Sequence, residues 1–496
     1  GYIFEKYINQ KQMGAYYTKE DITEYIGKST VLPFVFDVAR AKCKVAFENP
    51  KGPTVWDLLA EDPDRYIFAA VRHGVSESLP EDIAVGLNPP TLHQPVGEGP
   101  VPTLELRKGW NKPAPQTHAL PTETWRELIA RRNRYEAVKA KLAKGEVRDV
   151  NDLITLNLDI RQFAQDVIEN CEGPELLRAF WHAIEKVTIL DPTCGSGAFL
   201  FAALNILEPL YEACLTRMEA FVADLERSGE KHRPEKLSDL RKVLGHVAAH
   251  PNRRYFILKS IILNNLFGVD IMEEAVEICK LRLFLKLAAQ VEPDPARDNL
   301  GIEPLPDIDF NIRTGNSLVG YATYDEVQVA TTGTLDFGNA MERISVKAAD
   351  LQQAFDAFRA RQVEGDGSVP TEDKGELRQR LSALDDELNR YLAGECGVAP
   401  SKKDAYAKWL KSHRPFHWFV EFYSIMRSGG FDVIIGNPPY VEIPRDLSRP
   451  LLRATFRSAL ETWSRDEDLY TLVVERSLRL SRATSGQFGM ILPLSL

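Results

Sequence analysis

The stretch VTILDPTCGSGAFLFAAL, residues 187–204, decides the fold. Its first four residues predict a short buried strand, and its apolar end predicts a helix. Gly195 and Gly197 lie between the two, so the backbone can approach a ligand there and the helix N-terminus offers unpaired N–H groups. The spacing fits neither a GxGxxG loop nor a P-loop. Asp191 instead places a carboxylate at the strand end, which repels phosphates and favours a ligand that carries a cation.

Further short apolar runs alternate with helical stretches along the chain: LFGVDI (266–271), DFNI (309–312), FDVII (431–435) and FGMILP (488–493). Such alternation is typical of α/β proteins with a mostly parallel, doubly wound sheet. We therefore predict a Rossmann-like fold whose ligands bind at the carboxyl ends of the strands.

A second carboxylate, Asp270, ends the LFGVDI strand. An acid at this position usually binds ribose hydroxyls, about 20 residues after the glycine turn. Here Asp270 follows Asp191 by 79 residues, so extra helices must lie between them. An ordinary solvated acid at a strand end is the alternative.

The sequence Asn437-Pro438-Pro439-Tyr440 directly follows a buried strand. Two prolines remove two backbone donors and fix the chain, which leaves carbonyl groups free to accept hydrogen bonds. With the Asn437 side-chain carbonyl and the Tyr440 ring, this corner can accept two hydrogen bonds from a planar NH₂ group and stack on the ring that carries it. A bare turn is the alternative.

These motifs resemble those of a known family. DPTCGSGAFL, GVDI, GNSL (315–318) and NPPY, preceded by GAYYTKEDI (14–22), are similar in kind and order to the motifs of gamma-class N6-adenine DNA methyltransferases. In its size and long helical insertions, the chain is similar to Eco57I-like modification enzymes and to the methyltransferases of BREX phage-exclusion systems. The resemblance implies a class I methyltransferase that uses S-adenosylmethionine and acts on double-stranded DNA in a restriction-modification or phage-defence system, with other subunits as further partners.

The resemblance also implies a cofactor site. Asp191 and the Gly195–Gly197 backbone would hold the methionine part of S-adenosylmethionine, and Asp270 would hold its ribose. Asn316 would bind the cofactor's adenine, and Thr18, with Tyr17 nearby, would reach its carboxylate. Thr193 and Ile271 complete the expected cofactor residues.

The catalytic residues that the resemblance implies are Asn437, Pro438, Pro439 and Tyr440. Asn437 and the Pro438 carbonyl would bind the target amino group, while Tyr440 stacks on an adenine extruded from the duplex. Accepting both hydrogens localises the nitrogen lone pair, so catalysis would consist mostly of positioning and electrostatics.

Arginines just after this corner are candidates for phosphate contacts. Arg449, Arg453 and Arg457 would share one face of a helix. A solvated or acid-paired face is the alternative. The basic stretch 131–148 and the pair Arg253-Arg254 are weaker candidates of the same kind.

The chain divides into regions of different texture: a helical cap with the YYT motif (1–48), a Pro/Gly-rich loop region (49–121), a helical region (122–186), the first part of the methyltransferase core (187–340), a helical hairpin insertion (341–414) and the second part of the core with NPPY (415–496). A target-recognition domain normally follows in relatives, so we expect this sequence to be a piece of a longer protein.

Composition limits the alternatives. The 496 residues are 44% hydrophobic, and no apolar run approaches the 18 residues typical of a membrane span. The six cysteines show no CxxC or His-paired spacing, which predicts neither a metal site nor a disulfide framework and fits the cytoplasm. The net charge of −10 is unusual for a protein that binds nucleic acid. This charge favours one alternative, a cofactor-binding but catalytically silent subunit. A second alternative is a methyltransferase acting on RNA or on protein glutamine, because NPPY suits any planar amide or amine.

Overall fold

The computed structural model describes residues 18–87, 106–227, 236–250, 252–293, 295–296, 300, 302–332, 337–364, 371–442, 451–452, 455–456 and 468–493. The chain forms two compact units, which we describe separately. The sheet unit comprises Gly1–Cys43 and Ile168–Leu496, and the helical unit comprises Lys44–Val167.

The sheet unit contains a five-stranded parallel sheet in the order β3-β2-β1-β4-β5. Its strands are β1 (Ile189–Asp191), β2 (Leu266–Asp270), β3 (Ile312–Thr314), β4 (Val433–Gly436) and β5 (Gln487–Met490). The predicted Rossmann-like fold is therefore confirmed. The order reverses between β1 and β4, which is where ligands bind in such sheets.

The helices of this unit are α3 (Glu20–Lys42), α12 (Pro174–Lys186), α13 (Ala198–Arg227), α14 (Ser238–Ala249), α15 (Arg253–Asn264), α16 (Glu273–Ala288), α17 (Tyr324–Thr332), α18 (Phe337–Glu364), α19 (Thr371–Glu395), α20 (Lys403–His413), α21 (Trp418–Glu421), α22 (Tyr423–Arg427) and α25 (Leu469–Leu480).

Alternate strand residues pack on opposite faces of the sheet, as a pleated strand requires. Leu190, Phe267 and Ile434 share one buried cluster with the aromatic rings of Trp418 and Phe431. The other face lies against α3 and α13, which also pack on each other. Both faces are therefore covered, which explains why the strands read as continuous apolar runs.

Helix α13 is long and apolar enough to cross a membrane by length and composition. However, 67% of its most apolar 18-residue window is buried within the protein. It packs against α3, α12, α15 and the sheet. Its apolar character thus serves the protein core.

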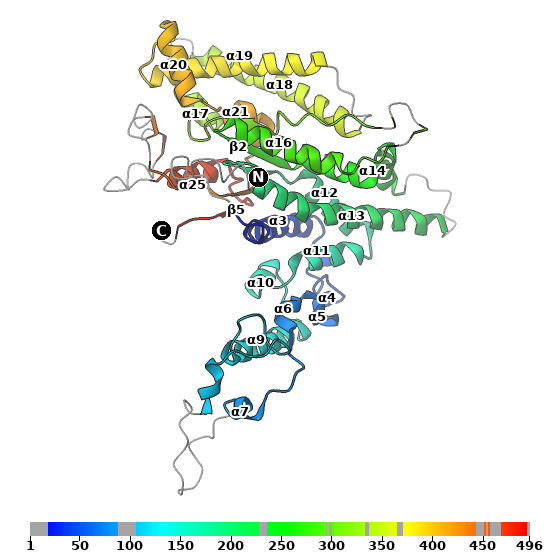
Figure 1. The fold of residues 1–496 in the computed structure, drawn as a ribbon. Helices are drawn as coiled ribbons and strands as arrows, with labels where there is room; N and C mark the ends of the chain where they lie inside the picture. Colours follow the sequence, from blue (N-terminus) through cyan, green and yellow to red (C-terminus); the bar gives the residue numbers. More distant parts are fainter. Residues whose placement is uncertain are drawn as a thin grey trace. The chain divides into compact units, whose positions relative to one another are not determined.

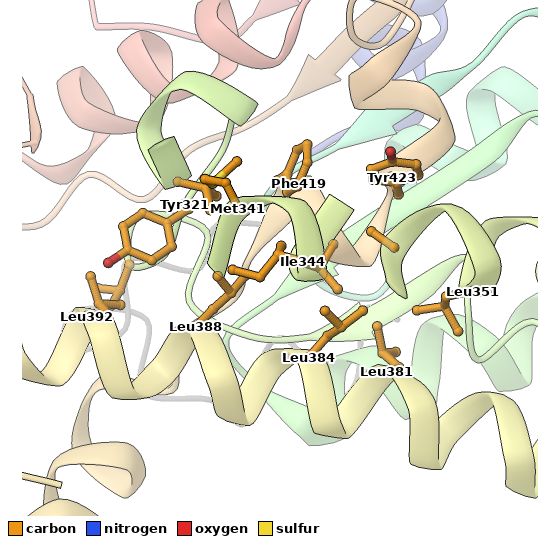
Figure 2. Close-up of a cluster of buried hydrophobic side chains, with 14 of the residues drawn as sticks. Tyr321, Met341, Ile344, Leu351, Leu381, Leu384, Leu388, Leu392, Phe419 and Tyr423 are labelled. Carbon is orange, nitrogen blue, oxygen red and sulfur yellow. The ribbon is translucent and has the colours of Figure 1, made fainter. Parts of the chain in front are cut away.

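The predicted antiparallel helical hairpin is present as α18 and α19, which lie side by side (Figure 1). Leucines of α19 face Ile344 and Leu351 of α18 in one buried cluster (Figure 2). An ion pair of 3.0 Å between Lys347 and Glu387 links the helices, and Arg361 pairs with Asp373 near the turn. Buried apolar residues recur every seven positions in both helices, at Ile344, Leu351 and Phe358 and at Leu377 and Leu384, which places them on the facing sides.

The helical unit contains η1 (Lys44–Ala46), α4 (Asp57–Glu61), α5 (Pro63–Tyr66), α6 (Ala69–Arg72), α7 (Glu81–Ala84), η2 (Lys108–Asn111), α9 (Trp125–Ala143), α10 (Val150–Thr155) and α11 (Ile160–Glu169), the last of which continues into the sheet unit. The stretch 49–121, predicted as loop, therefore contributes several short helices. Its prolines do not prevent them, because Pro63 begins α5 and Pro80 precedes α7, where no intrahelical N–H is needed.

The basic helix α9 is held by its own unit. Arg131 forms a bidentate ion pair with Glu123 and donates to the carbonyls of Val71 and His73. Lys139 pairs with Asp64 at 2.7 Å. Two of the cations that made this helix a candidate for DNA contacts thus stabilise the fold of the unit itself.

Candidate active site

The strand β1 ends at Asp191, whose side chain is 1% exposed. Its Oδ1 atom accepts a hydrogen bond of 3.1 Å from the Thr193 backbone N–H. Burial raises the pKa of Asp191 to about 8, and the nearby Asp270 carboxylate adds to the rise. A Cβ atom at Gly436, on the neighbouring strand, would lie 2.9 Å from Asp191 Oδ1, so only glycine leaves this carboxylate in place.

The second carboxylate, Asp270, is held by backbone groups on both oxygens. Oδ2 accepts from the Gly195 N–H at 2.9 Å, and Oδ1 accepts from the Met272 N–H at 2.8 Å. Burial raises its pKa as well. Two carboxylates with raised pKa values at one sheet edge favour a ligand that brings positive charge.

The glycine turn between β1 and α13 is left-handed at both glycines. Gly195 has φ +50°, and the space where its Cβ atom would stand is open. Gly197 has φ +86°, and a Cβ atom there would lie 2.5 Å from Cys279 Sγ on α16. Gly197 therefore lets the turn pack against α16, while Gly195 leaves room beside the carboxylates.

The loop after β3 joins the same edge. Ser317 donates from its hydroxyl to the Pro192 carbonyl, which connects GNSL to the glycine turn. The Asn316 N–H donates to the Arg414 carbonyl at 2.9 Å. Ile271, one residue beyond β2, has a side chain that is 45% exposed. The exposed Ile271 side chain thus follows the end of β2, and Asn316 follows the end of the neighbouring strand β3.

The NPPY corner follows β4. The Asn437 carbonyl accepts from Thr193 Oγ1 at 3.4 Å, which joins the corner to the glycine turn. Asn437 Nδ2 donates to Thr18 Oγ1 at 3.1 Å. The Tyr440 hydroxyl lies 2.8 Å from Asn437 Oδ1 and 2.6 Å from the Ile491 carbonyl. The hydrogen bond to Thr18 therefore orients the Asn437 side-chain amide, with Nδ2 toward Thr18 and Oδ1 toward Tyr440.

The structure brings most of the predicted site residues to one sheet edge: Thr18, Asp191, Thr193, Gly195, Gly197, Asp270, Ile271, Asn316, Asn437, Pro438, Pro439 and Tyr440. Tyr17, Arg449, Arg453 and Arg457 lie outside the described residues.

Sequence reasoning missed several residues that shape this edge. Arg282 of α16 donates to the Ser196 carbonyl at 2.6 Å and so holds the glycine turn from outside. Gly436 has no Cβ atom that would crowd the Asp191 carboxylate. A glycine directly before NPPY could have been noticed, whereas nothing in the sequence around Arg282 indicates its partner.

Two family models match the chain. Residues 264–496 match that of the Eco57I restriction-modification methylase, and residues 166–321 match that of the DNA-methyltransferase domain of MmeI. The second match contains the Asp191 turn and the first contains the NPPY corner. Both contain Asp270 and Asn316.

A protein of Methanocaldococcus jannaschii, inferred to be a type II restriction enzyme and methyltransferase, is 27% identical over 384 residues. The similarity covers 70% of this chain and 29% of that protein, so the chain spans less than a third of the relative's length. The predicted resemblance to Eco57I-like methyltransferases is thus confirmed: residues 264–496 are similar to the Eco57I restriction-modification methylase, and the chain is built on a Rossmann-like sheet.

Proposed function

We propose that this protein transfers a methyl group from S-adenosylmethionine to the N6 amino group of an adenine extruded from double-stranded DNA, within a restriction-modification or phage-defence system. The observation that carries the proposal is the hydrogen bond from Thr193 to the Asn437 carbonyl. It joins the NPPY corner to the glycine turn, which supports a reaction between an amino group bound at the corner and a cationic cofactor bound at the turn.

The residues present fit S-adenosylmethionine. Space is open at the Gly195 Cβ position, and the Gly195 N–H donates to Asp270. Asp191 ends the neighbouring strand, and the raised pKa values of both carboxyl groups favour the ligand's positive charges. Exposed Ile271 offers an apolar surface to an adenine ring. Each Asp270 oxygen accepts one backbone N–H and retains a lone pair for a ribose hydroxyl.

The chain's own part in the reaction is positioning. When bound, S-adenosylmethionine would supply an electrophilic methyl group and leave as S-adenosylhomocysteine, and the methylated nitrogen would lose one proton to solvent. Asn437 Oδ1 and the Pro438 carbonyl accept the two hydrogens of the target amino group, which localises the nitrogen lone pair. Asn437 Oδ1 holds the Tyr440 hydroxyl in this structure, so the amino group either takes the second lone pair of that oxygen or replaces the hydroxyl. The Tyr440 ring then stacks on the base.

The test is product analysis with the full-length protein. Unmodified duplex DNA, RNA and a glutamine-containing peptide are each incubated with isotopically methyl-labelled S-adenosylmethionine, and the hydrolysed products are identified by mass spectrometry. We expect labelled N6-methyladenine from DNA alone. Label in cytosine, RNA or glutamine would contradict the proposed substrate. Cofactor binding without any product would instead identify a catalytically silent subunit, which the net charge of −10 favours.

A further inference from the structure

Arg414 lies directly after α20, at the end of the hairpin insertion. Its backbone is left-handed, with φ 44° and ψ 56°, a conformation that a long side chain rarely adopts. Such strain persists only where the surroundings impose it, and it gathers at functional sites. Here the left-handed residue ends α20, where the Arg414 N–H donates to the Leu410 carbonyl at 2.9 Å, and two long-range contacts hold it in place.

Both long-range contacts of Arg414 are with predicted cofactor residues. Its carbonyl accepts from the Asn316 N–H at 2.9 Å, and Pro415 pairs with Asn316 as an isolated parallel bridge. Its Nη1 atom donates to the Ile271 carbonyl at 2.7 Å. Arg414 therefore links the loop after β2 to the loop after β3, 143 residues from Ile271 in sequence.

The rest of the guanidinium group is available. An arginine side chain has five N–H donors, and Arg414 is exposed. Among the described residues no carboxylate forms an ion pair with it. The Ile271 side chain, 45% exposed, belongs to the residue whose carbonyl holds the guanidinium. A planar cation beside an exposed apolar side chain suits a flat aromatic ring with acceptor nitrogens, since arginine both stacks on such rings and donates to their edges.

We propose that the Arg414 guanidinium contacts the adenine ring of the cofactor, so that the insertion 341–414 completes the cofactor site. The hairpin then has a role beyond its own packing: through α20 it delivers this side chain to the sheet edge. The inference rests on the proposed function for the identity of the cofactor.

The test is the Arg414→Gly variant. Glycine adopts a left-handed backbone freely, so this substitution removes the side chain while relieving the strain. We expect unchanged or higher thermal stability and about fivefold to tenfold weaker binding of S-adenosylmethionine by calorimetry, as for the loss of one ring–cation contact. Adenosine should lose affinity by the same factor, and methionine should lose none. Arg414→Lys should bind with intermediate affinity.

The matched control is Thr122→Gly, which replaces another left-handed residue, with φ 66°, in the helical unit. It should bind the cofactor as the unchanged protein does. Equal binding of S-adenosylmethionine by Arg414→Gly and the unchanged protein would overturn this inference alone. Failure of the unchanged protein to bind S-adenosylmethionine would instead overturn the proposed function. If Arg414→Gly loses stability, Arg414→Asn, which also tolerates the left-handed backbone, gives the same comparison.

Discussion

The two ends of the site are held in different ways. At the Asp191–Asp270 end, both carboxylates are held by backbone N–H groups of Thr193, Gly195 and Met272. At the NPPY end, the Asn437 amide is held by two side-chain hydroxyls, those of Thr18 and Tyr440. Backbone donors cannot leave without refolding a loop, whereas a hydroxyl can rotate to another partner. We therefore expect the first end to suit a ligand with fixed contacts, and the second to suit one that enters and leaves by exchanging hydrogen bonds.

Removing the amide at the exchangeable end should have the largest effect. The Asn437→Ala variant loses the main acceptor for the target amino group, and we expect kcat to fall by about 10² to 10³. Cofactor affinity, measured by calorimetry, should stay nearly unchanged because Asp191 and Asp270 are untouched. Normal methylation by this variant would show that the amino acceptor is misassigned.

The next effect separates the Tyr440 ring from its hydroxyl. Tyr440→Ala should lower kcat/KM for DNA by about 5- to 150-fold, the range expected for one base stack of about 1–3 kcal/mol. Tyr440→Phe keeps the ring and removes the hydroxyl, with its contacts to Asn437 Oδ1 and the Ile491 carbonyl, so its loss should be below about fivefold. Equal losses in the two variants would assign the role to the hydroxyl instead of the ring.

At the Asp191–Asp270 end, the affinity for the cofactor should depend on pH. Because the pKa of Asp191 is raised to about 8 without ligand, the carboxyl is mostly neutral at pH 6, and a cationic cofactor must ionise it. Affinity for S-adenosylmethionine should therefore rise from pH 6 to 8, by at most about tenfold per pH unit, and then level off. Asp191→Asn should bind weakly with a flat profile. Affinity that falls between pH 6 and 8 would rule out this pairing.

The same raised pKa affects the cofactor-free fold. A carboxyl group whose pKa is higher in the folded protein stabilises it below the ordinary value of 3.8, and this stability is lost as the pH rises toward about 8. Thermal unfolding without cofactor should show this loss, and Asp191→Asn should reduce it.

The smallest effect concerns Thr18, which the family resemblance assigns to the cofactor and the structure places on Asn437 Nδ2. If Thr18 orients the amide, Thr18→Val should lower kcat about fivefold, the value of one net hydrogen bond of about 1 kcal/mol. Thr18→Ser should restore it. A rise in KM for the cofactor with kcat unchanged would support the cofactor role alone.

The sequence identified all five strands but not all of their limits. The predicted strand at 309–312 begins in the structure only at Ile312. Asn311 makes the difference, because its side-chain amide donates to the carbonyls of Leu263 and Leu266 and turns the chain there. Asparagine favours such turns, yet within an apolar run this signal is easily outweighed by the neighbouring residues.

The sequence predicts the site residues that lie at strand ends, but not those that only tertiary contacts bring to the site. Asp191 and Asn437 adjoin apolar runs, so their place follows from the sheet. Arg414 follows a helix in an insertion, and only the fold brings it beside Ile271. The basic stretch 131–148 shows that the number of charges alone does not predict a nucleic-acid contact. Arg131 forms an ion pair with Glu123, which the sequence does not reveal.

The contact between Thr18 and Asn437 also bears on how the protein is made. The two residues are 419 positions apart, and α3, which follows Thr18, packs on β4 and β5. During synthesis the apolar side of α3 must therefore wait until β4 and β5 have left the ribosome. Such distant pairing slows folding and leaves apolar surface open to aggregation. The protein should thus depend on chaperones until β4 and β5 are made, and a chain stopped before β4 should be insoluble.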